Sequence, residues 1–81
     1  MDRKELFEKL TGVFRDVMNN EEIVLEETTS ANDIDEWDSL SQIVLLAEIQ
    51  KNFSIRFKSS DPLRWKNVGD MVDTIASLIS T

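Results

Sequence analysis

The residue most open to chemistry is Ser39, which stands between Asp38 and Leu40 where an acidic stretch meets a predicted helix. A serine hydroxyl can act as a nucleophile or carry a covalent group. The chain has no histidine and no cysteine, which excludes the usual serine–histidine pair, thiol catalysis, disulfides and thiolate metal sites. A serine at a helix start ordinarily binds a free backbone N–H, so the weight of this tripeptide depends on its surroundings.

The acidic stretch at residues 32–38 has, at first sight, the composition of a calcium loop. An EF-hand loop that began at Asp33 would have ligand-type residues at its first and third positions. It would then place Trp37 at the fifth position, Asp38 where glycine is required and Val44 where a bidentate glutamate belongs. The pattern therefore does not predict a metal site.

Paired carboxylates are another source of chemistry, because one can act as an acid while the other acts as a base. Such a pair needs a walled cleft that raises the pKa of one carboxyl group and leaves the other ionised. A chain of 81 residues has little material for a cleft of this kind. Because histidine is also missing, we predict no catalytic residue and no enzymatic activity for the isolated chain.

Length and composition predict one helix-rich domain over residues 1–81, with 41% apolar residues. The formal net charge of −7 argues against nucleic acid as a partner. Residues 1–38 hold 12 acidic and 4 basic side chains, whereas residues 39–81 hold 4 acidic and 5 basic ones. The acidic half is either a solvated helix surface or a negative field that steers basic partners.

The N-terminus carries no targeting pattern, because residues 1–5 run directly into an amphipathic stretch. No apolar run approaches the roughly 20 residues that are needed to cross a bilayer. We therefore expect a cytoplasmic protein without a membrane span.

The apolar spacing predicts an all-α fold. A first helix of about 16 residues follows Asp2 and ends at residues 19–20, with apolar side chains at steps of three and four. Residues 21–38 have no sustained period and form a long loop, which Ile23 and Leu25 are expected to anchor to the core.

Three further helices are predicted after this loop. Asp38 is the expected N-cap of a second helix that ends near Asn52. Pro62 opens a short helix, because Asn67 and Asp70 offer a new capping pair only a few residues later. The second helix carries these apolar residues: Leu40, Ile43, Val44, Leu46, Ala47 and Ile49.

The stretch at residues 33–40, followed by the apolar helix at residues 43–49, resembles the modification site of acyl carrier proteins. The resemblance extends over essentially the whole chain. It includes the first helix, the long loop, a helix that ends in Phe53 before a short extended stretch at residues 55–57, and the closing residues 68–75. The short motif is common, but motif, position and helix order together are specific.

The resemblance implies a four-helix bundle of three longer helices and one short third helix. It also implies that Ser39 is the attachment point of a 4'-phosphopantetheine arm, which a separate phosphopantetheinyl transferase takes from coenzyme A. The terminal thiol of that arm holds an acyl group as a thioester, and a chain without cysteine needs such a borrowed thiol. A phosphodiester on Ser39 would lie at a helix N-terminus, where an anion is favoured.

By the same resemblance, Asp38 helps the transferase to recognise the site in addition to capping the helix, and Leu40 packs inward to hold the helix start. A groove beside the core is expected to shelter part of the acyl chain, although plain core packing explains its candidate residues as well. These candidates are Leu46, Ile49, Phe53 and Met71.

Several residues depart from the family pattern. Ile34 stands where fatty-acid carriers have Leu-Gly, and Trp37 is a lid over the loop, a partner contact or ordinary packing. The second helix is poor in acidic residues, and the third-helix region is cationic where familiar carriers are acidic. These departures favour a dedicated carrier for a specialised pathway, whose expected partner contacts are Asp35, Glu36, Trp37, Ile43, Arg64 and Trp65.

The leading interpretation is a monomeric acyl carrier in fatty-acid, polyketide or related biosynthesis. Its partners would be the transferase, an acyl-loading enzyme, and synthase or acyltransferase enzymes. One alternative is an aminoacyl or peptidyl carrier of a ligase or nonribosomal synthetase, whose arm chemistry is identical. Another is an unmodified helical interaction module, in which Ser39→Ala would leave the function intact.

Overall fold

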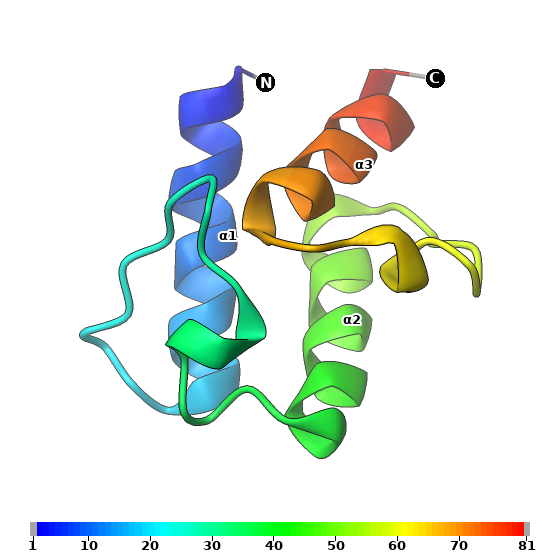
Figure 1. The fold of residues 1–81 in the computed structure, drawn as a ribbon. Helices are drawn as coiled ribbons and strands as arrows, with labels where there is room; N and C mark the ends of the chain where they lie inside the picture. Colours follow the sequence, from blue (N-terminus) through cyan, green and yellow to red (C-terminus); the bar gives the residue numbers. More distant parts are fainter. Residues whose placement is uncertain (1, 81) are drawn as a thin grey trace.

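The computed structural model describes residues 2–80, so the two ends of the predicted 1–81 domain, Met1 and Thr81, lie outside the described residues. Three α-helices and two short 3-10 turns follow one another (Figure 1), and no strand occurs among the described residues. The elements are α1 (Arg3–Met18), η1 (Ala31–Asp33), α2 (Ser39–Phe53), η2 (Pro62–Arg64) and α3 (Val68–Ser80). The predicted all-α fold is confirmed.

The short third helix differs from the prediction, because it is a single 3-10 turn of three residues. Pro62 begins it as expected, but Trp65 already returns to extended backbone. Asn67 then caps α3, since its Oδ1 accepts the Asp70 backbone N–H at 2.9 Å. Because the backbone becomes extended at Trp65, the turn does not continue as an α-helix, and residues 2–80 hold three α-helices instead of four.

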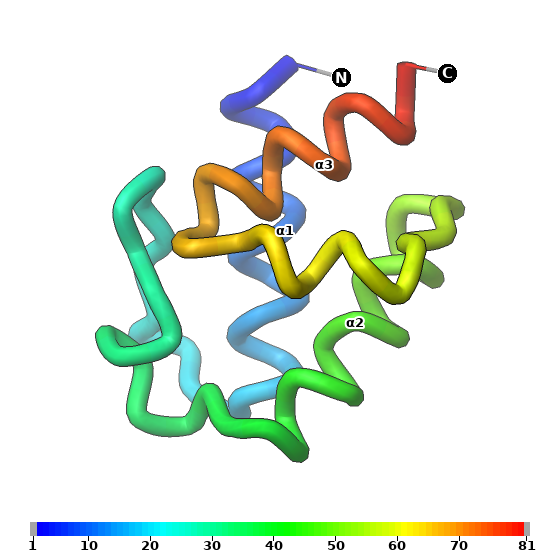
Figure 2. The backbone as a smooth tube through the Cα atoms, turned by 45° about the vertical axis from the view of Figure 1, so that its right-hand side comes forward, coloured from blue at the N-terminus to red at the C-terminus, as the bar shows by residue number. Residues whose placement is uncertain are grey.

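Helix α1 has the predicted length and ends. Asp2 caps it by accepting the Glu5 backbone N–H at 2.8 Å, and Asn19 ends it in the left-handed conformation with φ 53°. α1 and α2 run side by side in opposite directions, and α3 crosses their upper ends (Figures 1 and 2). Their buried side chains form one core: Leu6, Leu10, Val13, Phe14 and Met18 of α1, Leu45, Ile49 and Phe53 of α2, and Val68, Met71, Val72 and Ile75 of α3. No helix among residues 2–80 has both the length and the apolar character that crossing a membrane requires.

The long loop between α1 and α2 is tied down at two places, near its start and near its middle. Arg15 Nε donates to the Ile23 carbonyl at 2.9 Å, and Ile23 and Leu25 are buried in the core as predicted. Farther along, the first backbone N–H groups of α3 donate to the loop, with Gly69 N to the Glu27 carbonyl at 2.9 Å. The middle of the loop consequently lies against the start of α3 (Figure 2), and the acidic stretch follows this contact in the chain.

The prediction that Leu40 packs inward is wrong, because 76% of its surface is exposed. The buried face of α2 follows Leu45, Ile49 and Phe53, at steps of four residues. Leu40 lies five residues before Leu45, which places it about 140° round the helix from that face. Ser41 occupies the inward position instead and makes polar contacts there.

Candidate functional site

The start of α2 is fixed by a reciprocal cap between Asp38 and Ser41. Asp38 Oδ1 accepts the Ser41 backbone N–H at 2.9 Å, and Ser41 Oγ accepts the Asp38 backbone N–H at 2.8 Å. The predicted N-cap is thereby confirmed. The hydrogen bond from the Ser41 backbone N–H, supported by the Ser41 side chain, holds the pKa of the Asp38 carboxyl below its usual value. The cap therefore carries a negative charge beside Ser39 throughout the neutral pH range.

Ser39 is the first residue of α2, and its side chain is exposed. Its hydroxyl makes no hydrogen bond to any residue from 2 to 80, whereas the Ser41 hydroxyl also donates to the Glu36 carbonyl at 2.8 Å. Of the two serines at the helix start, Ser39 alone offers an unengaged hydroxyl to solvent. The hydroxyl of Ser41 is committed to the cap.

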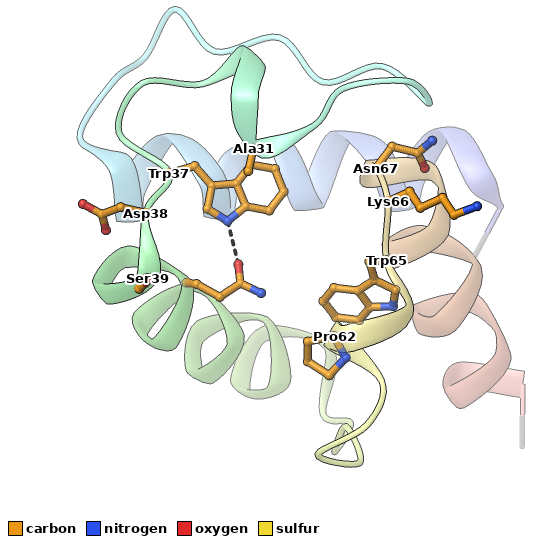
Figure 3. Close-up of a pocket in the computed structure, with 9 residues that line it drawn as sticks. Ala31, Trp37, Asp38, Ser39, Pro62, Trp65, Lys66 and Asn67 are labelled. Atoms are coloured by element: carbon orange, nitrogen blue, oxygen red, sulfur yellow. Dashed lines mark hydrogen bonds between the residues drawn. The ribbon is translucent and has the colours of Figure 1, made fainter.

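Ser39 stands at the edge of a groove of about 370 Å³, which we call the two-tryptophan groove. Its lining comes from two separate parts of the chain. Trp37, Ser39 and Gln42 line one side, and Pro62, Trp65 and Asn67 line the other. In Figure 3 the two indole rings face the hollow from opposite sides, with Ser39 at its edge.

Both tryptophans are half-buried and held by hydrogen bonds. Trp37 Nε1 donates to Gln42 Oε1 at 2.6 Å, and its ring meets Phe14 edge-on with centroids 5.0 Å apart. Trp65 Nε1 donates to Thr74 Oγ1 at 2.9 Å, and its ring packs in the same manner on Phe57 at 5.1 Å. The packing role considered for Trp37 is thus present, and a partner contact remains a prediction for both residues.

The other predicted contact residues do not all lie at the groove. Asp35, Glu36 and Ile43 are exposed on the acidic stretch and on α2. Arg64 is exposed too, but it lines a different hollow together with Asp73 of α3. The predicted contacts therefore cover more than one face of the molecule.

Asp33, the first position of the rejected calcium loop, has a local structural role. Its Oδ2 accepts the Ser30 backbone N–H at 2.9 Å and so caps the η1 turn. Within residues 2–80 no three acidic, histidine or cysteine side chains gather in a way that could hold a metal ion. Turn and helix capping thus accounts for Asp33 and Asp38, two of the four acidic residues in this stretch.

The residues considered for sheltering an acyl chain belong mainly to the packed core. Ile49, Phe53 and Met71 are buried there, and Leu46 is half-buried on α2. None of these residues lines the groove at Ser39. Gln42 and Asn67 line the groove instead, and neither residue is predicted from the sequence to lie there. Helical spacing does not relate Gln42 to Trp37, because Trp37 lies before the start of α2.

A model of the phosphopantetheine attachment site matches residues 8–75 of this chain. The chain is also similar to the holo acyl carrier protein of Geobacter metallireducens, whose solution NMR structure superposes with a TM-score of 0.87. The two sequences are 39% identical, and the match covers 91% of this chain and 85% of that one. The chain belongs to the acyl carrier protein family. Among the curated proteins, none matches the present chain.

Membership fixes the class of cofactor, which is a covalently attached 4'-phosphopantetheine. The residues of this carrier-family chain fit such a group. An exposed, unengaged serine hydroxyl stands at the N-terminus of a 15-residue helix. The positive end of the helix dipole favours a phosphodiester at that position. The groove beside it has the size of a small-molecule site, for which about 300–1,000 Å³ is usual.

Proposed function

We propose that residues 1–81 form one carrier domain that holds acyl intermediates as thioesters on a 4'-phosphopantetheine arm attached to Ser39. The pathway would be fatty-acid, polyketide or a related specialised biosynthesis in the cytoplasm. The arm supplies a terminal thiol, which this cysteine-free chain lacks. The chain itself would catalyse nothing and would serve separate enzymes as a monomer.

The observation that carries this proposal is the difference between the two serine hydroxyls at the start of α2. Ser39 is exposed and unengaged among the described residues, while Ser41 holds the cap. No side chain within residues 2–80 forms a hydrogen bond with the Ser39 hydroxyl, and the chain has no histidine to act as its base. A serine without a base is a poor nucleophile on its own, so its activation must come from the transferase.

The exposed side of α2 next to Ser39 supports docking of partner enzymes. Leu40, Ile43 and Val44 project from it, with 76%, 68% and 51% of their surfaces exposed. Apolar side chains that share a helix face in this way are typical of an interaction surface. We propose that the transferase and the acyl-handling enzymes contact this face, with Asp35, Glu36 and Asp38 as its acidic border.

Acyl loading tests the proposed function. The chain is first incubated with coenzyme A and a broad-specificity phosphopantetheinyl transferase, and then with an acyl-loading enzyme. Neutral hydroxylamine should release the acyl group, because it cleaves thioesters readily and the chain has no cysteine of its own. Intact-protein mass spectrometry follows each step.

The outcomes separate the alternatives. Loading by an adenylating enzyme with an amino acid, and never with a fatty acid, would identify an aminoacyl carrier. A folded chain that accepts no arm, and whose Ser39→Ala variant keeps its cellular function, would contradict the carrier role and identify an interaction module.

A further inference from the structure

The two-tryptophan groove is assembled from segments that are far apart in the sequence. Trp37 belongs to the loop before α2, whereas Trp65 follows η2 and precedes α3. Their indole rings stand on opposite sides of the hollow (Figure 3), and the edge of the hollow includes Ser39. The groove is thus continuous with the proposed attachment point.

The walls of this groove are fixed before any ligand arrives. Each indole N–H has a protein acceptor, Gln42 Oε1 for Trp37 and Thr74 Oγ1 for Trp65. Each ring is also packed edge-on against a phenylalanine of the core or its border. A ligand that enters the groove therefore meets preformed aromatic surfaces, and little ordering of side chains opposes its binding.

The groove also offers polar groups that match amides. The oxygen of the Gln42 side chain is taken by Trp37, which leaves its NH2 group as a donor. Likewise, the Asn67 side-chain oxygen is taken by the Asp70 backbone N–H, and its NH2 group remains. No hydrogen bond from either NH2 group to another residue occurs within the described chain. The Gln42 amide lies between the two indoles (Figure 3), and a donor in that place suits a ligand that alternates apolar carbon with carbonyl groups.

A phosphopantetheine arm on Ser39 has this composition, since it carries a branched apolar carbon and two amides in succession. We propose that the two-tryptophan groove binds the part of the arm nearest to the phosphate, with its methyl groups against Trp65 and an amide carbonyl near Gln42. The inference rests on the proposed function at Ser39. In this proposal Trp37 and Trp65 form the two walls that contact the arm, and the residues of the packed core do not contact it.

The volume of the groove agrees with this occupant. About 370 Å³ accommodates a small flexible ligand but not the arm together with a long acyl chain. Ile49 and Met71, which would have to part for a chain to enter the core, are fully or almost fully buried. The arm is therefore the better occupant than its cargo.

Isotope-filtered NMR tests the inference. The protein is labelled with ¹³C and ¹⁵N, and the arm is transferred to it from unlabelled coenzyme A. We expect nuclear Overhauser effects from the methyl protons of the arm to the indole ring of Trp65. Trp65 is decisive because Trp37 lies only two residues from Ser39 and would sense any attached group.

A second sample carries a hexanoyl group on the arm and distinguishes arm from cargo. The effects from the arm methyl protons to Trp65 should persist in it. Effects to Trp65 from the hexanoyl protons alone would overturn the inference, as would arm effects confined to residues 37–43 in the holo protein. The mass spectrum of each sample shows whether the arm is attached, so a failure of the attachment is recognised separately from a failure of the groove.

Discussion

Two serines at the start of α2 differ in what their hydroxyls do. Ser41 exchanges hydrogen bonds with Asp38, and both residues are thereby committed to the helix start. Ser39, between them, is left exposed. Asp38 and Ser41 therefore cap the helix, and the Ser39 hydroxyl remains available for chemistry. A substitution of Ser39 is expected to leave the cap intact.

Asp38 is predicted to combine a capping role with a recognition role, and two variants separate them. Asp38→Asn should keep the free energy of unfolding within about 0.5 kcal/mol, because asparagine caps as well as aspartate. Asp38→Ala should lower it by about 0.5–2 kcal/mol, since the Ser41 N–H loses its acceptor. If the charge serves recognition, both variants should be modified more slowly by the transferase. Normal modification of Asp38→Asn, measured by mass spectrometry over time, would limit Asp38 to capping.

At the scale of elements, α2 has two apolar faces with different surroundings. One face ends in the core at Leu45, which is fully buried, and the other leaves Ile43 68% exposed. Burial stabilises the fold through the first face only. The second face is available to another protein.

Alanine substitutions on the two faces should therefore change different quantities, stability on the buried face and binding of the transferase on the exposed face. Leu45→Ala should lower the free energy of unfolding by about 2–5 kcal/mol, because it removes a fully buried side chain. Ile43→Ala should change it by less than about 0.5 kcal/mol and should weaken the interaction with the transferase. Urea denaturation and transferase kinetics measure the two quantities. A large loss of stability in Ile43→Ala, or unchanged kinetics, would contradict the assignment of the faces.

The contact between the long loop and α3 depends on Gly69. A Cβ atom at this position would lie 2.8 Å from the Glu27 carbonyl oxygen, so Gly69→Ala should destabilise the fold by about 1–3 kcal/mol. Gly12, on the exposed side of α1, is a matched control, because a Cβ atom there meets nothing within 4 Å. Gly12→Ala should stabilise the fold by about 0.5–1 kcal/mol. Equal melting temperatures for the two variants would argue against a close contact at Gly69.

Arg3 connects three parts of the whole molecule. Its guanidinium donates to Glu27 of the long loop at 2.6 Å, to Asp73 of α3 at 2.9 Å and to the Gly69 carbonyl at 3.3 Å. The hydrogen bond from Arg3 holds the pKa of the Glu27 carboxyl below its usual value of 4.5. The pair is exposed to solvent, so its contribution to stability is small and screened by salt.

The sign of its pH dependence follows from the lowered pKa. Glu27 is charged in the folded protein above its unfolded pKa, and the stabilisation is lost as the pH falls through the lower folded pKa. The melting temperature of the native chain should therefore exceed that of Arg3→Met at pH 7, and the difference should shrink below about pH 4.5. Lys4→Met is the control, because it removes a neighbouring charge whose side chain makes no hydrogen bond or ion pair within residues 2–80. A difference for Arg3→Met that does not depend on pH would exclude the ion pair as its cause.

Helix ends could be predicted from the sequence because capping is local. Asp2 and Asp38 cap α1 and α2 as their residue types indicate. The inward face of α2 could not be predicted in the same way, since the helix is apolar on nearly every side and its period does not choose between Leu40 and Leu45. Tertiary contacts with α1 decide it.

The motif predicts Ser39 as the attachment point, but no pattern in the sequence predicts the groove beside it. Trp37 and Trp65 come together only through the path of the chain between α2 and α3, which no local pattern encodes. The sequence places Arg64 and Lys66 on either side of Trp65, and in the fold Lys66 lines the groove together with Trp65. Arg64, in contrast, lines a different hollow together with Asp73 of α3.

The measurement that tests the central claim most directly locates the arm on the protein. The native chain, Ser39→Ala and Ser39→Thr are incubated with coenzyme A and a phosphopantetheinyl transferase, and their intact masses and fragment spectra are recorded. We predict one phosphopantetheine on the native chain, in the fragment that contains Ser39, and none on Ser39→Ala, whose circular dichroism should remain helical. An arm on Ser41, or an arm still added to a folded Ser39→Ala, would contradict the account.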